Sequence, residues 1–178
     1  AKEVASISKG AVISAGDGIE SGNNNDSAKE GIPLLDVATI SIEPVVIETP
    51  SVGVEFTVDV NVTGGKNIAS FQFTLTYDET ALEFVEVKLG DYLPAGAFAV
   101  PAKVDAGSVL YGATAIGATA AKADGTLAIL PFNVVAEKDS AIGFSWASLS
   151  DVIAKEVASI SKGAVISAGD GIESGNNN

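Results

Sequence analysis

Hydrophobic and polar side chains alternate along most of the chain, in short segments that turn residues separate. Residues 54–62 read VEFTVDVNV, in which every second residue is Val or Phe and the residues between them are Glu, Thr, Asp and Asn. Residues 70–77, SFQFTLTY, show the same alternation. A period of two predicts a strand with one buried side and one solvent-facing side, and this pattern is typical of antiparallel sheets.

Further β-type segments occupy residues 34–47, 82–87, 108–112, 126–136 and 142–146, and Gly, Pro, Asp and Lys residues stand between them. No hydrophobic period of 3.6 residues extends over a useful length of the chain. Many short strands with frequent turns are characteristic of sandwiches and jelly rolls. The sequence therefore predicts an all-β protein, a jelly-roll antiparallel β-sandwich of about nine strands with an extra N-terminal strand segment.

Most aromatic residues fall on the predicted inward sides of these strands, where we expect them to form core and not a sugar-binding platform. Residues 92–103 contain Pro94, Gly96 and Pro101 and are expected to form a loop. Tyr92 is the one loop aromatic that we nominate for contact with a carbohydrate. The residues predicted to face inward are Phe56, Phe71, Phe73, Phe84, Phe132, Phe144 and Trp146.

The first 25 residues of the chain recur at its end. Residues 1–25 and residues 154–178 both read AKEVASISKGAVISAGDGIESGNNN, and an internal repeat of this kind bears on the whole architecture. The chain can be one period of a tandem array, with residues 1–25 ending the preceding unit. Alternatively, neighbouring subunits exchange a terminal strand, or an engineered duplication allows self-complementation. A duplication without any biological role is the fourth alternative.

The repeat divides the chain into three predicted parts. Residues 1–14 duplicate residues 154–167, and we expect them to belong to, or pair with, a neighbouring unit. Residues 15–31 are rich in Gly, Asn, Ser and Asp, which predicts a linker. Residues 32–178 form the predicted sandwich, which ends in the second copy. The predicted inter-unit strand residues are Val4, Ile7, Val12 and Ile13.

Composition narrows the classes of function. The chain carries 10 Lys or Arg residues against 23 Asp or Glu residues, for a net charge of −13, and it has no His, Cys or Met. This charge argues against binding to nucleic acid and to anionic membrane surfaces, and no hydrophobic run is long enough for a membrane span. Without His and Cys the usual general base and thiol nucleophile are missing, so we expect a non-enzymatic protein.

The sequence also contains candidate residues for metal binding and for glycosylation. Oxygen ligands crowd into the predicted linker, which would suit Ca²⁺, although a solvated linker without metal is the alternative; no cofactor is predicted with certainty. Two N-x-S/T triplets mark glycosylation candidates. The candidate Ca²⁺ ligands are Asp17, Glu20, Asn23, Asn25 and Asp26, and the candidate glycosylation sites are Asn25 and Asn61.

Three stretches in matching order resemble cohesin domains. In residues 71–91, FQFTLTYDETALEFVEVKLGD, an aromatic alternating strand ends in Tyr-Asp and is followed by a second strand and Gly-Asp. Residues 123–151 place Asp-Gly before a hydrophobic strand and end in Leu-Ser-Asp, and residues 161–166 (SKGAVI) stand where the final cohesin strand follows. The resemblance covers about residues 37–167.

The resemblance implies a jelly-roll sandwich and, as in cohesins, a role in binding dockerin modules on scaffold or cell-surface proteins. Fold alone does not fix function, so three hypotheses stand. The first is an extracellular or cell-surface structural module that polymerises or repeats in tandem into a filament or array, with copies of itself as partners and the duplicated segment as the joint. The second is a cohesin-type module that binds a dockerin-like partner. The third is a carbohydrate-binding adhesin domain.

Overall fold

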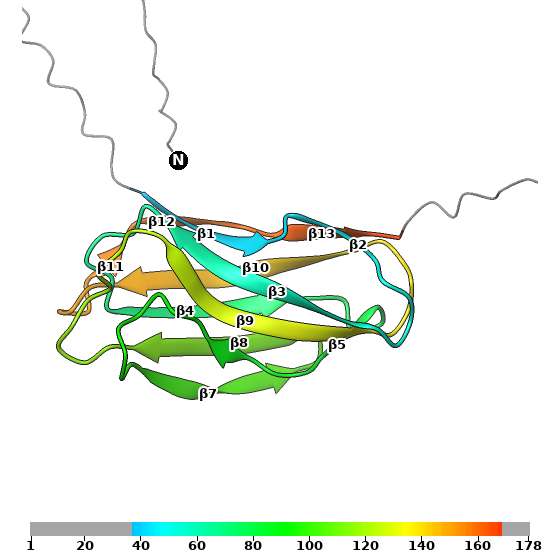
Figure 1. Cartoon of the computed structure of the whole chain (residues 1–178), viewed down its shortest axis with the longest axis horizontal. Helices are drawn as coiled ribbons and strands as arrows, with labels where there is room; N and C mark the ends of the chain where they lie inside the picture. The colour runs from blue at the N-terminus through cyan, green and yellow to red at the C-terminus, as the bar shows by residue number, and fades with distance from the viewer. Residues whose placement is uncertain (1–36, 169–178) are drawn as a thin grey trace, which may run out of the picture. The chain divides into compact units, whose positions relative to one another are not determined.

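The computed structural model describes residues 37–168, which contain thirteen strands and no helix (Figure 1). The predicted strand at residues 54–62 appears as β3, and the one at residues 70–77 appears as β4. The strands are β1 (Ala38–Glu43), β2 (Val46–Glu48), β3 (Glu55–Thr63), β4 (Ser70–Thr76), β5 (Leu82–Phe84), β6 (Lys88–Leu89), β7 (Phe98–Asp105), β8 (Ser108–Thr114), β9 (Gly125–Val134), β10 (Ser140–Ser150), β11 (Glu156–Val157), β12 (Ser159–Lys162) and β13 (Ala164–Ser167).

These strands form two sheets that pack face to face. One sheet has the order β12-β1-β3-β9-β5, with β6 also paired to β9, and the other has the order β2-β13-β10-β4-β8-β7, with β11 paired to β10. The pairs within both sheets are antiparallel except β1 with β12 and β2 with β13, which are parallel. The predicted all-β jelly-roll sandwich is confirmed.

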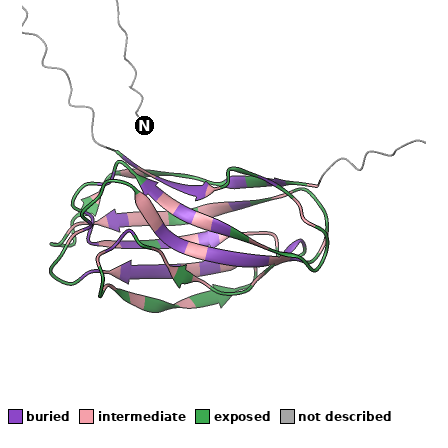
Figure 2. Ribbon diagram, viewed as in Figure 1, coloured by how far each residue is buried: buried purple, intermediate pink, exposed green. Residues whose placement is uncertain are grey.

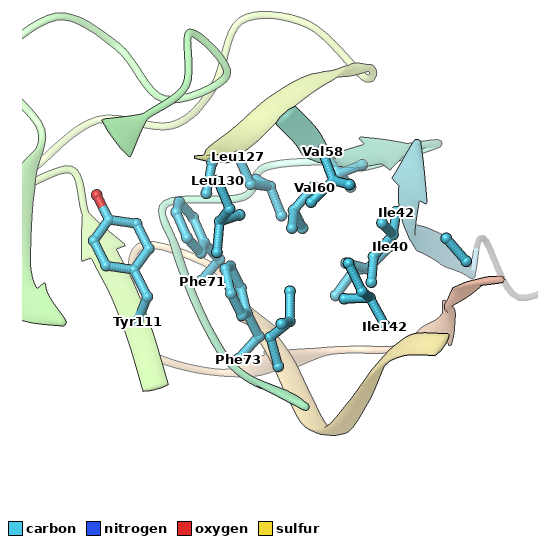
Figure 3. Packing of buried hydrophobic residues seen from close by; sticks show 14 of the residues in the cluster. Ile40, Ile42, Val58, Val60, Phe71, Phe73, Tyr111, Leu127, Leu130 and Ile142 are labelled. Atoms are coloured by element: carbon cyan, nitrogen blue, oxygen red, sulfur yellow. The ribbon is translucent and has the colours of Figure 1, made fainter. Parts of the chain in front are cut away.

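Alternation along the strands builds the core between the sheets (Figures 2 and 3). In β3, Val58, Val60 and Val62 are fully buried, whereas the residues between them, Asp59 and Asn61, are partly exposed. Phe73 on β4 and Leu130 on β9 enter the same core from opposite sheets. Burying a large hydrophobic side chain contributes roughly 1.5–3 kcal/mol, so the period-two pattern specifies which side of each strand faces inward.

Aromatic rings reinforce this core in two groups. Phe132 on β9 packs against Phe56, Tyr77 and Phe84, with ring centroids 6.1, 5.2 and 5.9 Å away. A second group joins Phe71, Phe73, Tyr111 and Phe144 on the other sheet, with centroid distances of 5.8–6.1 Å. The prediction that the strand aromatics form core is therefore correct for every residue in that set except Trp146, which is 49% exposed.

The chain crosses from one sheet to the other at two places that lie side by side. β1 passes through Pro44 into β2, and β12 passes through Gly163 into β13. Figure 1 shows both crossings along the upper edge of the molecule. The second copy of the repeat thus supplies three strands, β11, β12 and β13.

The predicted loop at residues 92–103 is wrong over its second half. Strand β7 begins at Phe98 and pairs with β8 as the edge of its sheet. Pro101 lies in an irregularity of the register between Val100 and Lys103, a position that tolerates proline because no regular ladder bond is required. None of the β7 residues is buried (Figure 2), so the strand lacks the strong hydrophobic alternation that identifies the others.

Candidate functional site

The outer face of the β10-β4-β8-β7 sheet carries a shallow groove. It encloses about 500 Å³, and each of the four strands contributes outward-facing side chains to it. Residues directly opposite in neighbouring strands share a face, so the register gives the arrangement row by row. The rows across β10, β4, β8 and β7 are Trp146–Thr74–Leu110–Lys103, Ser148–Gln72–Gly112–Val100 and Ser150–Ser70–Thr114–Phe98.

Trp146 faces outward because of a bulge in β10. Phe144 pairs with Leu75 and Trp146 pairs with Thr74, so that Ser145 is an extra residue with no partner in β4. A bulge shifts the side-chain alternation by one residue. The prediction that Trp146 points inward assumed an unbroken period of two, and the inserted Ser145 makes it wrong.

Gly112 keeps the floor of the groove low. A Cβ atom at this position would lie 2.8 Å from the carbonyl oxygen of Phe71 and 3.1 Å from the Cγ of Gln72. Any side chain here would push against the β4 backbone and displace Gln72. The glycine therefore leaves a depression between Gln72 and the exposed Val100 of β7.

Charge is absent from the three central strands of this face. β4, β8 and β10 contain no Asp, Glu, Lys or Arg, although the chain as a whole carries 33 such residues by the counts above. The charged residues of the face lie on the edge strand β7, where the ammonium of Lys103 is 3.7 Å from the carboxylate of Asp105. The groove thus joins exposed apolar side chains to neutral hydroxyl and amide groups, and the charged residue in its lining is Lys103 at the β7 edge.

Most groups with a shifted pKa lie away from this groove; the exception is Tyr111, which is among its lining residues. A hydrogen bond from Lys138, followed by those from Thr80, lowers the pKa of Asp78 to about 2, and a hydrogen bond from Lys122 lowers the pKa of Asp91. Burial raises the pKa of Tyr77, Tyr92 and Tyr111. Among residues 37–168 no three His, Cys, Asp or Glu residues cluster as metal ligands do, and this part of the chain holds no helix that could span a membrane.

The predicted site residues fall mostly outside the described part of the chain. The inter-unit strand residues and the candidate Ca²⁺ ligands, Asn25 among them, all lie before residue 37, so these assignments stay predictions. Asn61 lies on the outer side of β3, where its Oδ1 accepts a hydrogen bond of 2.8 Å from the Oγ1 of Thr126; its glycosylation also stays a prediction.

The nomination of Tyr92 for carbohydrate contact is wrong. Its side chain is only 2% exposed, and it packs against two glycines. A Cβ on Gly65 would lie within contact of the Tyr92 hydroxyl, and one on Gly125 would lie 3.0 Å from its ring. Gly65 and Gly125 stand far from Tyr92 in the sequence, so the local pattern does not show that the ring is covered.

The groove itself was not predicted. Its signal lies in the outward positions of SFQFTLTY and SVLYGAT, which hold Ser, Gln, Thr, Leu and Gly in a strongly acidic chain. The prediction concerned which side of each strand is buried and did not compare the solvent-facing sides with one another. That comparison requires the strand order, which the sequence pattern does not provide.

Comparison with known proteins identifies relatives of this sandwich. A family model described as cohesin domain matches residues 40–167. Similar solved structures include a non-cellulosomal cohesin from the hyperthermophilic archaeon Archaeoglobus fulgidus, with a TM-score of 0.62 and 17% identity over 73% of this chain and 89% of that chain. No curated protein matches the chain in sequence.

Two further solved structures have the same fold. A type II cohesin domain from the cellulosome of Acetivibrio cellulolyticus has a TM-score of 0.61 and 20% identity over 73% of this chain and 95% of that chain. A type I cohesin–dockerin complex from Clostridium thermocellum has a TM-score of 0.62 and 17% identity over 73% of this chain and 92% of that chain. At these identities the likeness establishes the fold.

Proposed function

The chain belongs to the cohesin domain family, and we propose that it is a non-enzymatic protein-recognition module that binds a dockerin-like partner through the groove on the β10-β4-β8-β7 face. The structure from Clostridium thermocellum is a complex of a cohesin with a dockerin, and one from Acetivibrio cellulolyticus also contains a dockerin. This kinship supports the second of the three functional hypotheses better than the first.

The observation that carries the proposal is the face around Trp146, whose three central strands β4, β8 and β10 carry no charged residue. Interface cores are depleted of charged residues and enriched in aromatic ones, because burying an unpaired charge costs far more than burying a hydroxyl or a hydrocarbon. Trp146 is half-exposed, and Phe98 and Val100 beside the groove are 59% and 52% exposed. A partner that covers these side chains would gain their burial without desolvating a carboxylate.

An extracellular or cell-surface location is part of this proposal. The resemblance to cohesins implies a module that is part of a scaffold or cell-surface protein. The absence of Cys and Met from the sequence leaves no easily oxidised side chain, which suits exposure outside the cell.

A pair of Thr→Glu variants tests the assignment of the binding face. Thr74 lies on the face of the groove, paired with Trp146 on one side and Leu110 on the other, and both of these line the groove. Thr57 lies on the opposite sheet, paired with Pro131. Both are strand residues with outward side chains, so Thr57→Glu is the control for the effect of a new carboxylate on folding and net charge. Binding to a panel of purified dockerin modules would be measured by isothermal titration calorimetry.

We expect Thr74→Glu to lower the affinity for a bound dockerin at least tenfold and Thr57→Glu to leave it unchanged. Thermal unfolding of both variants would verify that each remains folded. Equal affinities for the two variants would place the partner on another surface. Failure of the wild-type chain to bind any dockerin in the panel would contradict the proposed partner.

Self-association through the duplicated segment is a second candidate function. The specific observation that favours it is that residues 156–167 form β11, β12 and β13, while residues 3–14 have the same sequence. A filament, or a tandem array of such units, would use this repetition as its joint. Electron microscopy and sedimentation of the wild-type chain test it: regular fibres or concentration-dependent growth support it, and monomers at all concentrations contradict it.

The third hypothesis, a carbohydrate-binding adhesin, relied on Tyr92, which is buried.

A further inference from the structure

Residues 159–167 of the second repeat copy occupy a slot in the sandwich, which is formed by β1, β2 and β10. β12 runs parallel to β1, from Ser159 opposite Ala38 to Lys162 opposite Ser41. β13 then lies between β10 and β2, with Val165 opposite both Ala141 and Val46. Further backbone bonds extend the pairing: Val165 donates to the Val45 carbonyl at 2.9 Å, and Thr49 donates to the Ser167 carbonyl at 2.9 Å. An occupant of this slot therefore completes both sheets of the sandwich.

The slot makes specific demands on its occupant. At the crossing between the sheets, a Cβ on Gly163 would lie 2.5 Å from the Ile142 carbonyl oxygen, so only glycine fits there. Ala164 and Ile166 are 3% and 2% exposed and form part of the core. The occupant must therefore present glycine, a small residue and a large hydrophobic residue at positions one, two and four of this tetrapeptide.

Residues 6–14 meet every one of these demands, because they repeat residues 159–167 letter for letter. Gly10 corresponds to Gly163, Ala11 to Ala164 and Ile13 to Ile166. We propose that residues 6–14 of one chain fill the slot of a second copy of this chain, in place of residues 159–167 of that copy. The inference rests on the self-association proposed above and names its joint.

Each chain has one slot and two segments of identical sequence that fit it, residues 6–14 and residues 159–167. When one segment fills the slot of its own chain, the other is free to bind elsewhere. Within a chain the second copy has the advantage, because only residues 151–158 separate β12 from β10. That connection is held by Asp151, whose Oδ1 accepts hydrogen bonds from the amides of Ile153 and Lys155, each at 2.9 Å. A short connection costs less closure entropy than a long one, so the spare is the N-terminal copy.

The N-terminal copy has the reach to serve another sandwich. Residues 15–37 separate it from β1, and 23 residues span at most about 80 Å when fully extended. Exchange between chains replaces each contact with an identical one, so mass action decides the outcome. We expect exchange wherever the acceptor's own second copy is weakened or the local concentration of chains is high.

The test mixes an acceptor whose own copies are both disabled with a donor whose N-terminal copy is intact. The acceptor is the Gly10→Val/Gly163→Val double variant, in which neither copy can pass the Ile142 carbonyl. The donor is the affinity-tagged wild-type chain, and the matched control donor is tagged Gly10→Val. The two donors differ from each other only in the spare copy, because the slot of each is filled by its own residues 159–167.

We expect tagged wild-type donor to retain at least ten times more acceptor than the Gly10→Val donor, and light scattering to show a one-to-one complex. An acceptor that does not fold alone would be unfolded in denaturant and refolded together with each donor, and the same ratio would be measured. Retention by neither donor, or by both equally, would overturn the proposal.

The outcome is separable from that of self-association itself. Fibres that form equally well from Gly10→Val chains would overturn this joint while leaving assembly through another surface in place. A donor–acceptor complex without wild-type fibres would keep the joint and contradict the filament.

Discussion

The two outer faces of the sandwich have the same alternating construction but differ in charge. On the β10-β4-β8-β7 face the three central strands carry no charged residue, and Trp146 and Leu110 lie among Ser, Thr and Gln side chains. The face of the other sheet carries charge on most of its strands. Its outward charged residues are Glu43, Glu55, Asp59, Glu83, Lys88 and Lys162.

This difference in charge assigns solubility to one face of the sandwich and partner binding to the other. Carboxylates spread over one sheet keep the protein soluble and discourage association there. A neutral face costs less to desolvate. A partner that covers it does not need to supply an opposing charge, as it would on the face that carries carboxylates. In a chain with a net charge of −13, a face without charges on its central strands is the natural place for a protein interface.

The largest expected effect comes from removing the aromatic side chain of the neutral face. Trp146→Ala should weaken binding of a dockerin that the wild-type chain binds by about 30-fold or more, because a tryptophan at the centre of an interface commonly contributes 2 kcal/mol or more. Ile160→Ala is the control, since Ile160 is 51% exposed on the other sheet and Trp146 is 49% exposed. Calorimetric affinities that fall equally for both variants would remove the distinction between the faces.

A smaller effect is expected from the charged face. Glu43 on β1 lies directly opposite Asp59 on β3, and like charges in opposing positions are destabilising. Asp59→Lys would replace this repulsion with an attraction and should raise the free energy of unfolding by about 0.5–1 kcal/mol, with no change in dockerin affinity.

Salt supplies the control for this prediction. Screening weakens interactions between exposed charges, so the gain measured by urea denaturation should shrink as NaCl rises from low concentration to 1 M. A gain that does not depend on salt would assign the effect to packing instead of charge.

The fold could be predicted from the sequence because period-two alternation reports directly on burial. β3 and β4 appear where alternation is strongest, and Val58 and Phe73 occupy the core as their positions in the pattern require. The sequence resemblance added the closing strands, and the family match over residues 40–167 confirms it.

The groove could not be predicted in the same way, since it depends on a bulge and on strand order. One extra residue, Ser145, reverses the side on which Trp146 lies, and no turn residue marks that insertion. β7 was missed because an edge strand with exposed Phe98, Val100 and Val104 lacks the contrast between buried and exposed positions. Pattern analysis identifies what each strand buries, whereas the binding face depends on which strands become neighbours.

The smallest effect concerns the loops that connect the two faces. Asp78 lies between β4 and β5, which belong to different sheets, and its carboxylate is 2.8 Å from the ammonium of Lys138, between β9 and β10. The hydrogen bond from Lys138 and those from Thr80 lower the pKa of Asp78 from 3.8 to about 2. A lowered pKa in the folded state means that folding stabilises the ionised carboxylate. Its contribution to the free energy of unfolding is therefore complete above pH 3.8 and disappears as the pH falls towards 2.

The variant Asp78→Asn tests this contribution, because it keeps an acceptor for Thr80 and removes only the charge. Because the pair is exposed, we expect this variant to melt at most a few degrees below the wild-type chain at pH 6 and to converge with it near pH 2. A difference in melting temperature that stays constant from pH 6 to pH 2 would show that the carboxylate acts through the shape of the turn and not through its charge.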